Sequence, residues 1–539
     1  MKSKKTIIAV IFLIGLLLRV VGLNKFPAGL NADEAALGYN AWSLIETGRD
    51  EHGTPWPITF RSFDDYKPGI YVYLTIPFVY LFGLNEWSVR LPSAILGSLS
   101  ILLVYYLSSK LFKKEFLPSI ISTIIFATSP WSIHFSRGAW EVNAALFFIL
   151  AGIYYFYESF KKPKLFVLFA VSFAISLYTY HSARIISPII ALSLLTIYRS
   201  NIFVLTKTSK FIFLGIFTGI VLSLPLATQM LSKEGQSRFS GVSIFSDSGP
   251  LWRALEQRRE HPASLYNRAI HNRYISYTLK FTQNYLSHFS PRFLFLNGDE
   301  IARSKVPDTG QFFLFLSIPF FLGLYFIIKE NTKFSKFILV WFFASPLAAS
   351  LTFQSPHALR SQNMVVPLSL IIAFGVWSAI KSSSIKNIYI SLFIVLMTYF
   401  LAIYIHQYYY VYPRQLPYAW QYGFDQISKY VKENEKGYEH IIITDRYDQP
   451  YILLAFYLHF PPQKMQSEIV MTPRDKFGFS TVRQMDKYSF KLIDFKNDIK
   501  NPNTLIISAD EPVDDNYLID TIKDPAGETM YKMLTNVKK

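Results

Sequence analysis

The sequence predicts an all-α polytopic membrane protein that carries a small α/β domain at its C-terminal end. Three observations lead to this prediction. Of the 539 residues, 51% are hydrophobic and 17% are aromatic, which is too apolar for a soluble protein of this size. Several apolar runs approach the ~20 residues that an α-helix needs to cross a bilayer. From about residue 412 onward, short apolar stretches alternate with polar ones instead.

The chain begins with "MKSKKTIIAVIFLIGLLLRVVGL", a basic start followed by an apolar stretch. This pattern also occurs in signal peptides. No small-x-small cleavage site precedes Asn24, however, and further apolar runs follow. We therefore expect a first helix that is retained.

The apolar segments are the predicted helices of the membrane region. The segment 69–84 is the weakest of them, because it is short, contains Pro77 and follows Lys67-Pro68. In chain order, the segments lie at 6–23, 69–84, 91–112, 116–133, 142–160, 164–181, 185–198, 210–231, 310–328, 335–353, 363–380 and 386–411.

The distribution of Lys and Arg decides how segment 69–84 is placed. If it lies along the outer surface, the loops that fall inside are all short and basic, as the positive-inside rule requires. These loops are 1–5, 110–115, 158–164, 199–210, 329–336 and 381–386. If segment 69–84 crossed the membrane, every later basic loop would move outside. We therefore expect about 11 transmembrane helices and one juxtamembrane helix. The net charge of +17 then reflects basic inner loops, and no nucleic acid partner is expected.

This topology divides the chain into a transmembrane domain, 1–411, and an extracytoplasmic α/β domain, 412–539. The long outer loops of the first domain are 24–90 and 232–309. In the second domain, "HIIITD", "PYILLAFYLHF" and "TLIISAD" alternate with polar stretches, which indicates short β runs flanked by helices. The segment 419–437 is predicted to be an amphipathic helix ending at Gly437.

Charged and polar residues concentrate in the predicted outer loops. Asp33 and Glu34 are adjacent acids about ten residues beyond the first helix. "FDDYKPG" follows in the same loop and supplies Asp64, Asp65 and Lys67. The remaining candidates come from the later outer loops: Arg137, Glu141, Tyr180, His181, Arg184, Arg303, His357 and Arg360. Any one of them could simply be a charge or aromatic ring at the membrane interface.

As a set, these residues suggest a site that binds an anion. Phosphate is the natural anion, because Lys and Arg offer it charge-assisted hydrogen bonds. A carboxylate facing it could act as a general base. Other chemistries are disfavoured by the absence of Cys and of the P-loop, HExxH and GxSxG motifs. No cofactor is required and no metal site is assigned, although a divalent cation could be held by the first-loop acids.

Over roughly residues 6–410 the sequence resembles GT-C glycosyltransferases of the dolichyl-phosphate-mannose protein mannosyltransferase type and the related bacterial lipid A aminoarabinose transferase. Six segments carry the resemblance in family order. They are "NADEAALGYNAWSLIETGRDEHG", "YKPGIYVYL" with "WSVRLPSAILGSLSILLVYYLSSKLF", "SPWSIHFSRGAWEVNAALFF", "YTYHSARIISPIIALSL", "GDEIARSKVPDTGQFF" and "SPHALRSQNMVVPLSLIIAFG".

The resemblance implies transfer of a sugar from a polyprenyl-phosphate donor, by inverting displacement at the anomeric carbon. Asp33 matches the family's first-loop acid, the expected general base, and Glu34 is its partner. Lys67 matches the lysine expected near the donor phosphate. Arg137 and Glu141 match the second outer motif, which usually ends in Asp, whereas this chain has the longer Glu141 there. Arg303 and Arg360 are further expected phosphate contacts.

The acceptor stays open between a protein hydroxyl, a lipid A-like phosphate, a cell-wall polymer and another lipid-linked glycan. Membrane lipid is the other expected partner, and the expected location is the plasma membrane with the catalytic loops outside. The alternatives are a transporter or flippase of lipid-linked glycans and a cell-envelope scaffold. A transporter should show polar residues at helix midpoints and repeat symmetry, and the sequence shows neither.

Overall fold

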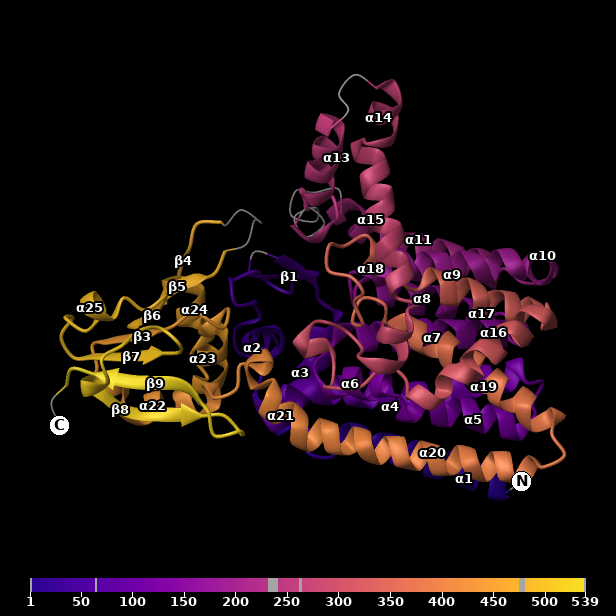
Figure 1. Cartoon of the computed structure of the whole chain (residues 1–539), viewed down its shortest axis with the longest axis horizontal. Coiled ribbons are helices and arrows are strands. Elements are labelled where there is room, and N and C mark those ends of the chain that lie inside the picture. The colour runs from indigo at the N-terminus through magenta and orange to yellow at the C-terminus, as the bar shows by residue number, and fades with distance from the viewer. Residues whose placement is uncertain (1, 64, 231–240, 261–263, 475–479, 538–539) are drawn as a thin grey trace. The chain divides into compact units, whose positions relative to one another are not determined.

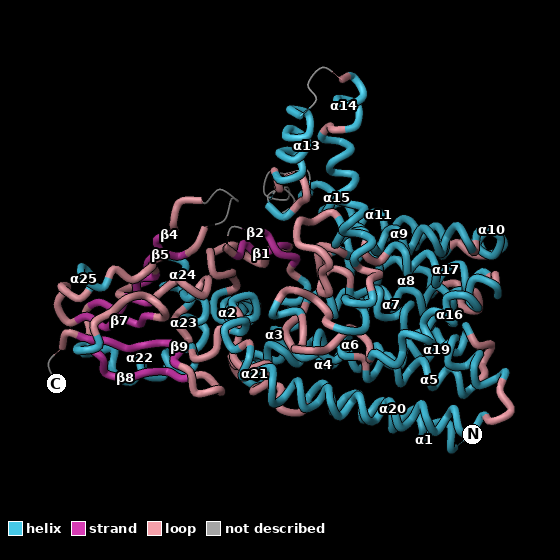
Figure 2. Tube along the Cα trace, in the orientation of Figure 1, coloured by secondary structure: helices cyan, strands magenta, loops and turns pink. Residues whose placement is uncertain are grey.

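The computed structural model describes residues 2–63, 65–230, 241–260, 264–474 and 480–537 (Figure 1). The chain forms two compact units, which are described separately. Unit 1 comprises Met1–Arg19, Ile95–Ser136 and Glu141–Tyr404, and unit 2 comprises Val20–Ala94, Arg137–Trp140 and Ile405–Lys539. Helices make up unit 1, whereas strands occur in the C-terminal part of the chain and in one pair within the first loop (Figure 2).

Unit 1 contains the apolar helices. Among the described residues, five helices are long and apolar enough to cross a membrane, or up to seven if each of two bent pairs is one span. The predicted helical membrane region is therefore confirmed, while the predicted number of spans stays a prediction. The helices lying wholly or mainly in this unit are α1 (Lys2–Val20), α4 (Glu86–Leu111), α5 (Phe116–Thr128), α6 (Pro130–Arg137), α7 (Glu141–Ser159), α8 (Leu165–Leu177), α9 (Ala183–Ile197), α10 (Arg199–Thr208), α11 (Phe211–Met230), α13 (Gly249–Glu260), α14 (Leu265–Ile270), α15 (Arg273–Ser287), α16 (Ser317–Glu330), α17 (Lys333–Ala344), α18 (Leu347–Ser350), α19 (Val365–Ser382) and α20 (Lys386–His406).

Proline breaks one of the expected helices. The predicted segment 116–133 forms two helices, α5 and α6, bent by 48°. Ser129 between them is extended, with ψ 136°, as expected for a residue that precedes a proline. Pro130 then begins α6, where its missing N–H costs no helical hydrogen bond.

Helices α16 and α19 pack closely through glycines. A Cβ atom added at Gly323 would overlap the carbonyl oxygen of Ile371, and one added at Gly375 would overlap that of Pro319. Small residues of this kind let two helix backbones approach within a membrane.

The first outer loop belongs to unit 2 and contains α2 (Ala32–Thr47), β1 (Thr59–Ser62), β2 (Asp65–Pro68) and α3 (Ile70–Phe82). Asn31 caps α2 in a capping box with Glu34, and the helix ends at Gly48, which has φ +69°. The strands pair antiparallel, with Lys67 opposite Phe60. Helix α3 forms where the juxtamembrane helix was expected and includes Pro77.

The C-terminal segment forms the predicted small α/β domain. Its seven-stranded sheet has the order β4-β5-β6-β3-β7-β9-β8, in which β3 runs parallel to both β6 and β7. The strands are β3 (His440–Ile443), β4 (Val470–Met471), β5 (Val482–Met485), β6 (Tyr488–Phe490), β7 (Thr504–Ser508), β8 (Leu518–Lys523) and β9 (Thr529–Thr535). The helices are α21 (Tyr412–Gln415), α22 (Phe424–Asn434), α23 (Pro450–Leu458), α24 (Pro462–Glu468) and α25 (Phe495–Asp498). The predicted boundary at 411/412 stays a prediction.

Candidate functional site

An acid and a lysine face each other in the first outer loop. Asp33 lies in the first turn of α2, where a negative charge is favoured by the free N–H groups of the helix end. Its Oδ1 accepts a hydrogen bond from Nζ of Lys67, which strand β2 presents. The Asp33 side chain is 39% exposed, whereas that of Lys67 is 10% exposed. An accessible carboxylate is thus held beside a nearly buried ammonium group.

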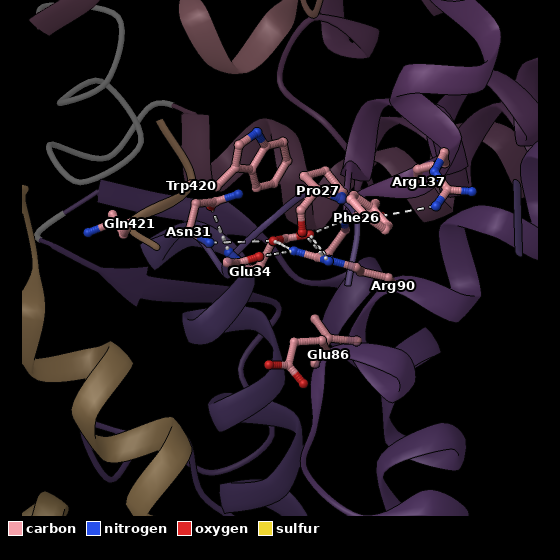
Figure 3. A network of polar contacts seen from close by, with 12 residues as sticks. Phe26, Pro27, Asn31, Glu34, Glu86, Arg90, Arg137, Trp420 and Gln421 are labelled. Atoms are coloured by element: carbon pink, nitrogen blue, oxygen red, sulfur yellow. Dashed lines mark hydrogen bonds and ion pairs between the residues drawn. The ribbon is translucent and has the colours of Figure 1, made fainter. Parts of the chain in front are cut away.

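Glu34, the neighbouring acid, is buried and fully engaged (Figure 3). Its two oxygens accept hydrogen bonds from Nε and Nη2 of Arg90, at 3.0 and 2.8 Å. The backbone N–H of Ala139 donates to Oε1 at 2.8 Å, and that of Asn31 lies 3.4 Å from Oε2. This carboxylate joins three separate segments of the unit and leaves little room for a substrate.

Two buried arginines hold the chain that precedes α2 (Figure 3). Arg90 also donates to the carbonyl oxygens of Leu23 and Pro27, at 3.0 and 3.1 Å. Nη2 of Arg137 donates to those of Val21 and Phe26, at 2.8 and 3.2 Å. The Arg137 guanidinium also lies 5.0 Å from the ring centroids of Tyr408 and Tyr409. A contact between Arg137 and the donor phosphate stays a prediction.

A third acid of this unit, Glu51, is fully buried, and the charge of Lys67 acts on it. Its side chain accepts a hydrogen bond from Asn40 at 3.1 Å, and its backbone N–H donates back to Asn40. The Tyr451 hydroxyl lies 3.4 Å from its second oxygen. Burial raises the pKa of Glu51 to about 8, although the nearby Lys67 charge opposes this shift. The carboxyl group is therefore protonated at neutral pH.

The C-terminal residues of unit 2 support α2. The Gln421 side chain accepts a hydrogen bond from the backbone N–H of Ala32 at 2.7 Å, directly before Asp33. Its amide nitrogen donates to the carbonyl oxygens of Tyr447 and Asp448, at 2.6 and 2.5 Å. The Tyr39 hydroxyl donates to the carbonyl oxygen of Phe460 at 2.6 Å. These bonds fix the helix that carries Asp33.

Unit 1 contains a second group of predicted residues, gathered around a pocket of about 150 Å³. Tyr180, His181, Arg184 and Arg360 line it together with Thr352 and apolar side chains. Nη1 of Arg360 donates to Thr352 Oγ1 at 2.7 Å. Burial lowers the pKa of Arg360, and the Tyr180 hydroxyl beside it counters this effect.

Neither pocket arginine has a described carboxylate within ion-pair distance, although the more distant charge of Asp299 acts on Arg360. Within the described part of the chain, neither Arg184 nor Arg360 forms an ion pair. Both side chains are only partly exposed. A partly buried charge without a close counter-charge is costly, and an anion in the pocket would offset that cost. The pocket therefore suits a phosphate attached to an apolar group.

His357 lies in a separate buried network of unit 1. Its Nδ1 is 3.5 Å from Oδ2 of Asp299, and its backbone N–H donates to Nε2 of His288 at 3.1 Å. Nδ1 of His288 therefore carries the proton that is shared with the carbonyl oxygen of Asn284, 2.8 Å away. Burial lowers the pKa of His288 to about 4, so this ring is neutral. The predicted role of His357 in the site stays a prediction.

The remaining candidates are dispersed. Arg303 lies in a short 3₁₀ helix, and its carbonyl oxygen is 2.7 Å from Nε2 of His134. Glu141 begins α7 and is buried, as is Asp65 on β2. Asp64 falls outside the described residues. Among the residues that are described, no three His, Asp or Glu side chains group as metal ligands.

Sequence reasoning did not select Arg90, Glu51, Asp299 or Gln421. The first three occur inside the motifs that carry the family resemblance, "WSVRLP", "GRDEHG" and "GDEIAR", so a signal was present. Gln421 has no such signal, because its importance comes from its contact with Ala32, distant in sequence.

Comparisons with known proteins bear on the fold. Residues 66–228 match the family model described as dolichyl-phosphate-mannose-protein mannosyltransferase. A search of curated protein sequences gives no match. The crystal structure of ArnT from Cupriavidus metallidurans in the apo state is similar, with 12% identity, 98% coverage of both chains and a TM-score of 0.57. The same protein bound to undecaprenyl phosphate is similar with 13% identity, 98% coverage of both chains and a TM-score of 0.53.

Proposed function

Because the chain is a membrane protein with the GT-C glycosyltransferase fold, we propose that it transfers a sugar from a polyprenyl-phosphate donor to an acceptor outside the cytoplasm. The Asp33 carboxylate carries this proposal. It is accessible, lies at the start of a helix and is held by Lys67. The neighbouring Glu34 is instead buried in an ion pair with Arg90.

In the proposed reaction, Asp33 takes the proton of an acceptor hydroxyl as its oxygen attacks the anomeric carbon of the sugar. The bond between that carbon and the phosphate oxygen breaks, and configuration at the carbon inverts. The leaving polyprenyl phosphate gains negative charge. Fixed cations stabilise charge that develops in this way, and Lys67 is one such cation. No nucleotide is needed, because the lipid phosphate activates the sugar.

We assign the arginine pocket of unit 1 to a lipid phosphate. Arg184 and Arg360 supply two cations that form no close ion pair with a described carboxylate, and apolar side chains such as Ile185 and Leu351 line the pocket beside them. The similar ArnT structure was determined with undecaprenyl phosphate, which supports this class of ligand. The expected partners are therefore a polyprenyl-phosphate sugar and membrane lipid.

Replacement of Asp33 tests the base assignment. Asp33→Asn keeps the shape of the side chain but cannot accept a proton, so transfer should fall about 100-fold or more. The thermal unfolding temperature should fall only slightly, because the amide oxygen of Asn can still accept the hydrogen bond from Lys67. The matched change Glu34→Gln should instead lower stability, by about 3–5 kcal/mol, because Arg90 loses its buried partner. Full activity of Asp33→Asn would contradict the assignment.

Replacement of Arg360 tests the phosphate pocket. Arg360→Gln should weaken the binding of undecaprenyl phosphate at least tenfold, since a partly buried charge-assisted contact is lost. Binding is measured by the fluorescence of a labelled lipid in detergent solution. Arg199→Gln removes an exposed arginine of the same unit and should leave binding unchanged. Equal affinity for both variants would exclude this pocket as the phosphate site.

A further inference from the structure

A helical arm extends from unit 1. It consists of α13, α14 and α15, which follow α11 along the chain. Figure 1 shows the arm standing away from α8, α9 and α11 of the same unit and running across their direction. If those apolar helices cross the bilayer, the arm extends along the membrane surface.

The arm exposes large apolar and aromatic side chains. Leu265 is 82% exposed, Tyr266 is 76% exposed and Trp252 is 59% exposed. On α15, Ile275, Leu279 and Leu286 are all exposed and recur at helical spacing, so they share one face. An apolar face of this kind needs a partner, because proteins rarely leave such surface in water.

The arm is also basic. Its described residues include six Arg and Lys side chains and only two acids, Glu256 and Glu260. None of the six cations forms an ion pair with a carboxylate of the described chain. Arg258 instead donates to backbone carbonyl oxygens, at 2.5 Å from that of His271. The six cations are Arg253, Arg258, Arg259, Arg268, Arg273 and Lys280.

A cavity of about 400 Å³ opens between α13 and α15. Arg253 lines it from one helix and Lys280 from the other, together with the apolar Ile275 and Leu279. Two cations from facing helices therefore lie beside apolar surface, which matches a phosphate joined to hydrocarbon. Asp247 is also in the lining, and its Oδ1 accepts a hydrogen bond from the backbone N–H of Gly249 at 2.9 Å.

We propose that the arm binds the anionic headgroup surface of the membrane and receives a lipid phosphate between α13 and α15. The exposed aromatic and aliphatic groups enter the boundary between headgroups and acyl chains, while Arg and Lys extend toward the phosphates. Attraction to anionic lipids adds to the apolar contribution. This inference goes beyond the proposed transfer reaction and does not depend on it.

The lack of cysteine in the chain allows a direct test. Leu265→Cys in the arm is labelled with a polarity-sensitive fluorophore, and Leu518→Cys on β8 is the control. Both proteins are reconstituted in nanodiscs of phosphatidylcholine, with and without phosphatidylglycerol. The arm probe should show blue-shifted emission and quenching by nitroxide lipids. Both effects should increase with phosphatidylglycerol, whereas the control should respond to neither lipid.

Two further measurements test the role of charge. Arg253→Gln combined with Lys280→Gln removes two of the six arm cations, so it should reduce the dependence on phosphatidylglycerol but leave the apolar contact in phosphatidylcholine. High salt should reduce the dependence on phosphatidylglycerol further in the unsubstituted arm, because it screens all six cations. The screening length is about 10 Å at 0.1 M and shorter at higher ionic strength. An arm probe that behaves like the control in both lipids would overturn the proposal. A shift that is equal in both lipids and insensitive to salt would overturn its anionic part.

Discussion

The two adjacent acids at the start of α2 have opposite environments. The Asp33 side chain is 39% exposed and that of Glu34 is 3% exposed. One is therefore available to an acceptor, while the other joins α2 to Arg90 of α4. The sequence placed both acids outside the membrane but could not divide their roles, because Arg90 lies 56 positions away. Arg184 and Arg360 were likewise predicted as site residues from the sequence, but only the structure shows that they line the same pocket.

Glu51 gives a prediction about pH. Its pKa is 4.5 in an ordinary environment and about 8 when buried, so the folded protein holds a proton that the unfolded chain loses. Stability should therefore fall as pH rises from about 4.5 to about 8. Glu51→Gln imitates the protonated form and should remove this decline. The thermal unfolding temperature, measured across that range, should be higher for the variant near neutral pH. A variant that is less stable at every pH would show that Glu51 is needed as a carboxyl group.

At the level of elements, apolar periodicity located helices well but could not place their breaks or separate short helices from strands. The predicted runs at 440–445 and 504–510 contain β3 and β7. The equally apolar run at 450–460 contains helix α23. A short, wholly buried run satisfies either structure, and tertiary contacts decide between them. The break between α5 and α6 depended on a single proline.

The contact of α16 with α19 gives a prediction at this scale. Gly375→Val adds a branched side chain where even a Cβ atom would overlap the Pro319 carbonyl oxygen. The helices must separate, so the variant should unfold at lower temperature, with a loss of about 1–3 kcal/mol for overpacking. Gly437→Val is the control, since no atom lies within 4 Å of its added Cβ. If Gly375→Val and Gly437→Val unfolded at the same temperature, α16 and α19 could move apart without loss of stability.

At the level of the whole molecule, the fold class and the family resemblance were correct from sequence, because composition and motif order reflect the entire chain. The sequence could not predict that Val20–Ala94 and Ile405–Lys539 belong to one compact unit. It depends on long-range contacts such as that between Ala32 and Gln421, 389 positions apart. No local pattern records such a contact.

The predicted sidedness can be tested with single cysteines. A cysteine at Gly437 should be labelled by an impermeant maleimide added to intact cells, because we expect the C-terminal domain outside. A cysteine at Lys162, in the predicted inner loop 158–164, should react only after permeabilisation. Both positions are exposed, so burial does not explain a difference. The reverse pattern would invert the topology and place Asp33 inside.

The central claim is that the chain transfers a sugar from a polyprenyl-phosphate donor. The most direct measurement incubates the purified protein with a panel of polyprenyl-phosphate sugars and an extract of envelope acceptors, and detects released polyprenyl phosphate and glycosylated product by mass spectrometry. We predict release from at least one donor, matched by product of inverted anomeric configuration, and loss of both in Asp33→Asn. Movement of intact donor across a bilayer, with no release from any donor, would contradict the account.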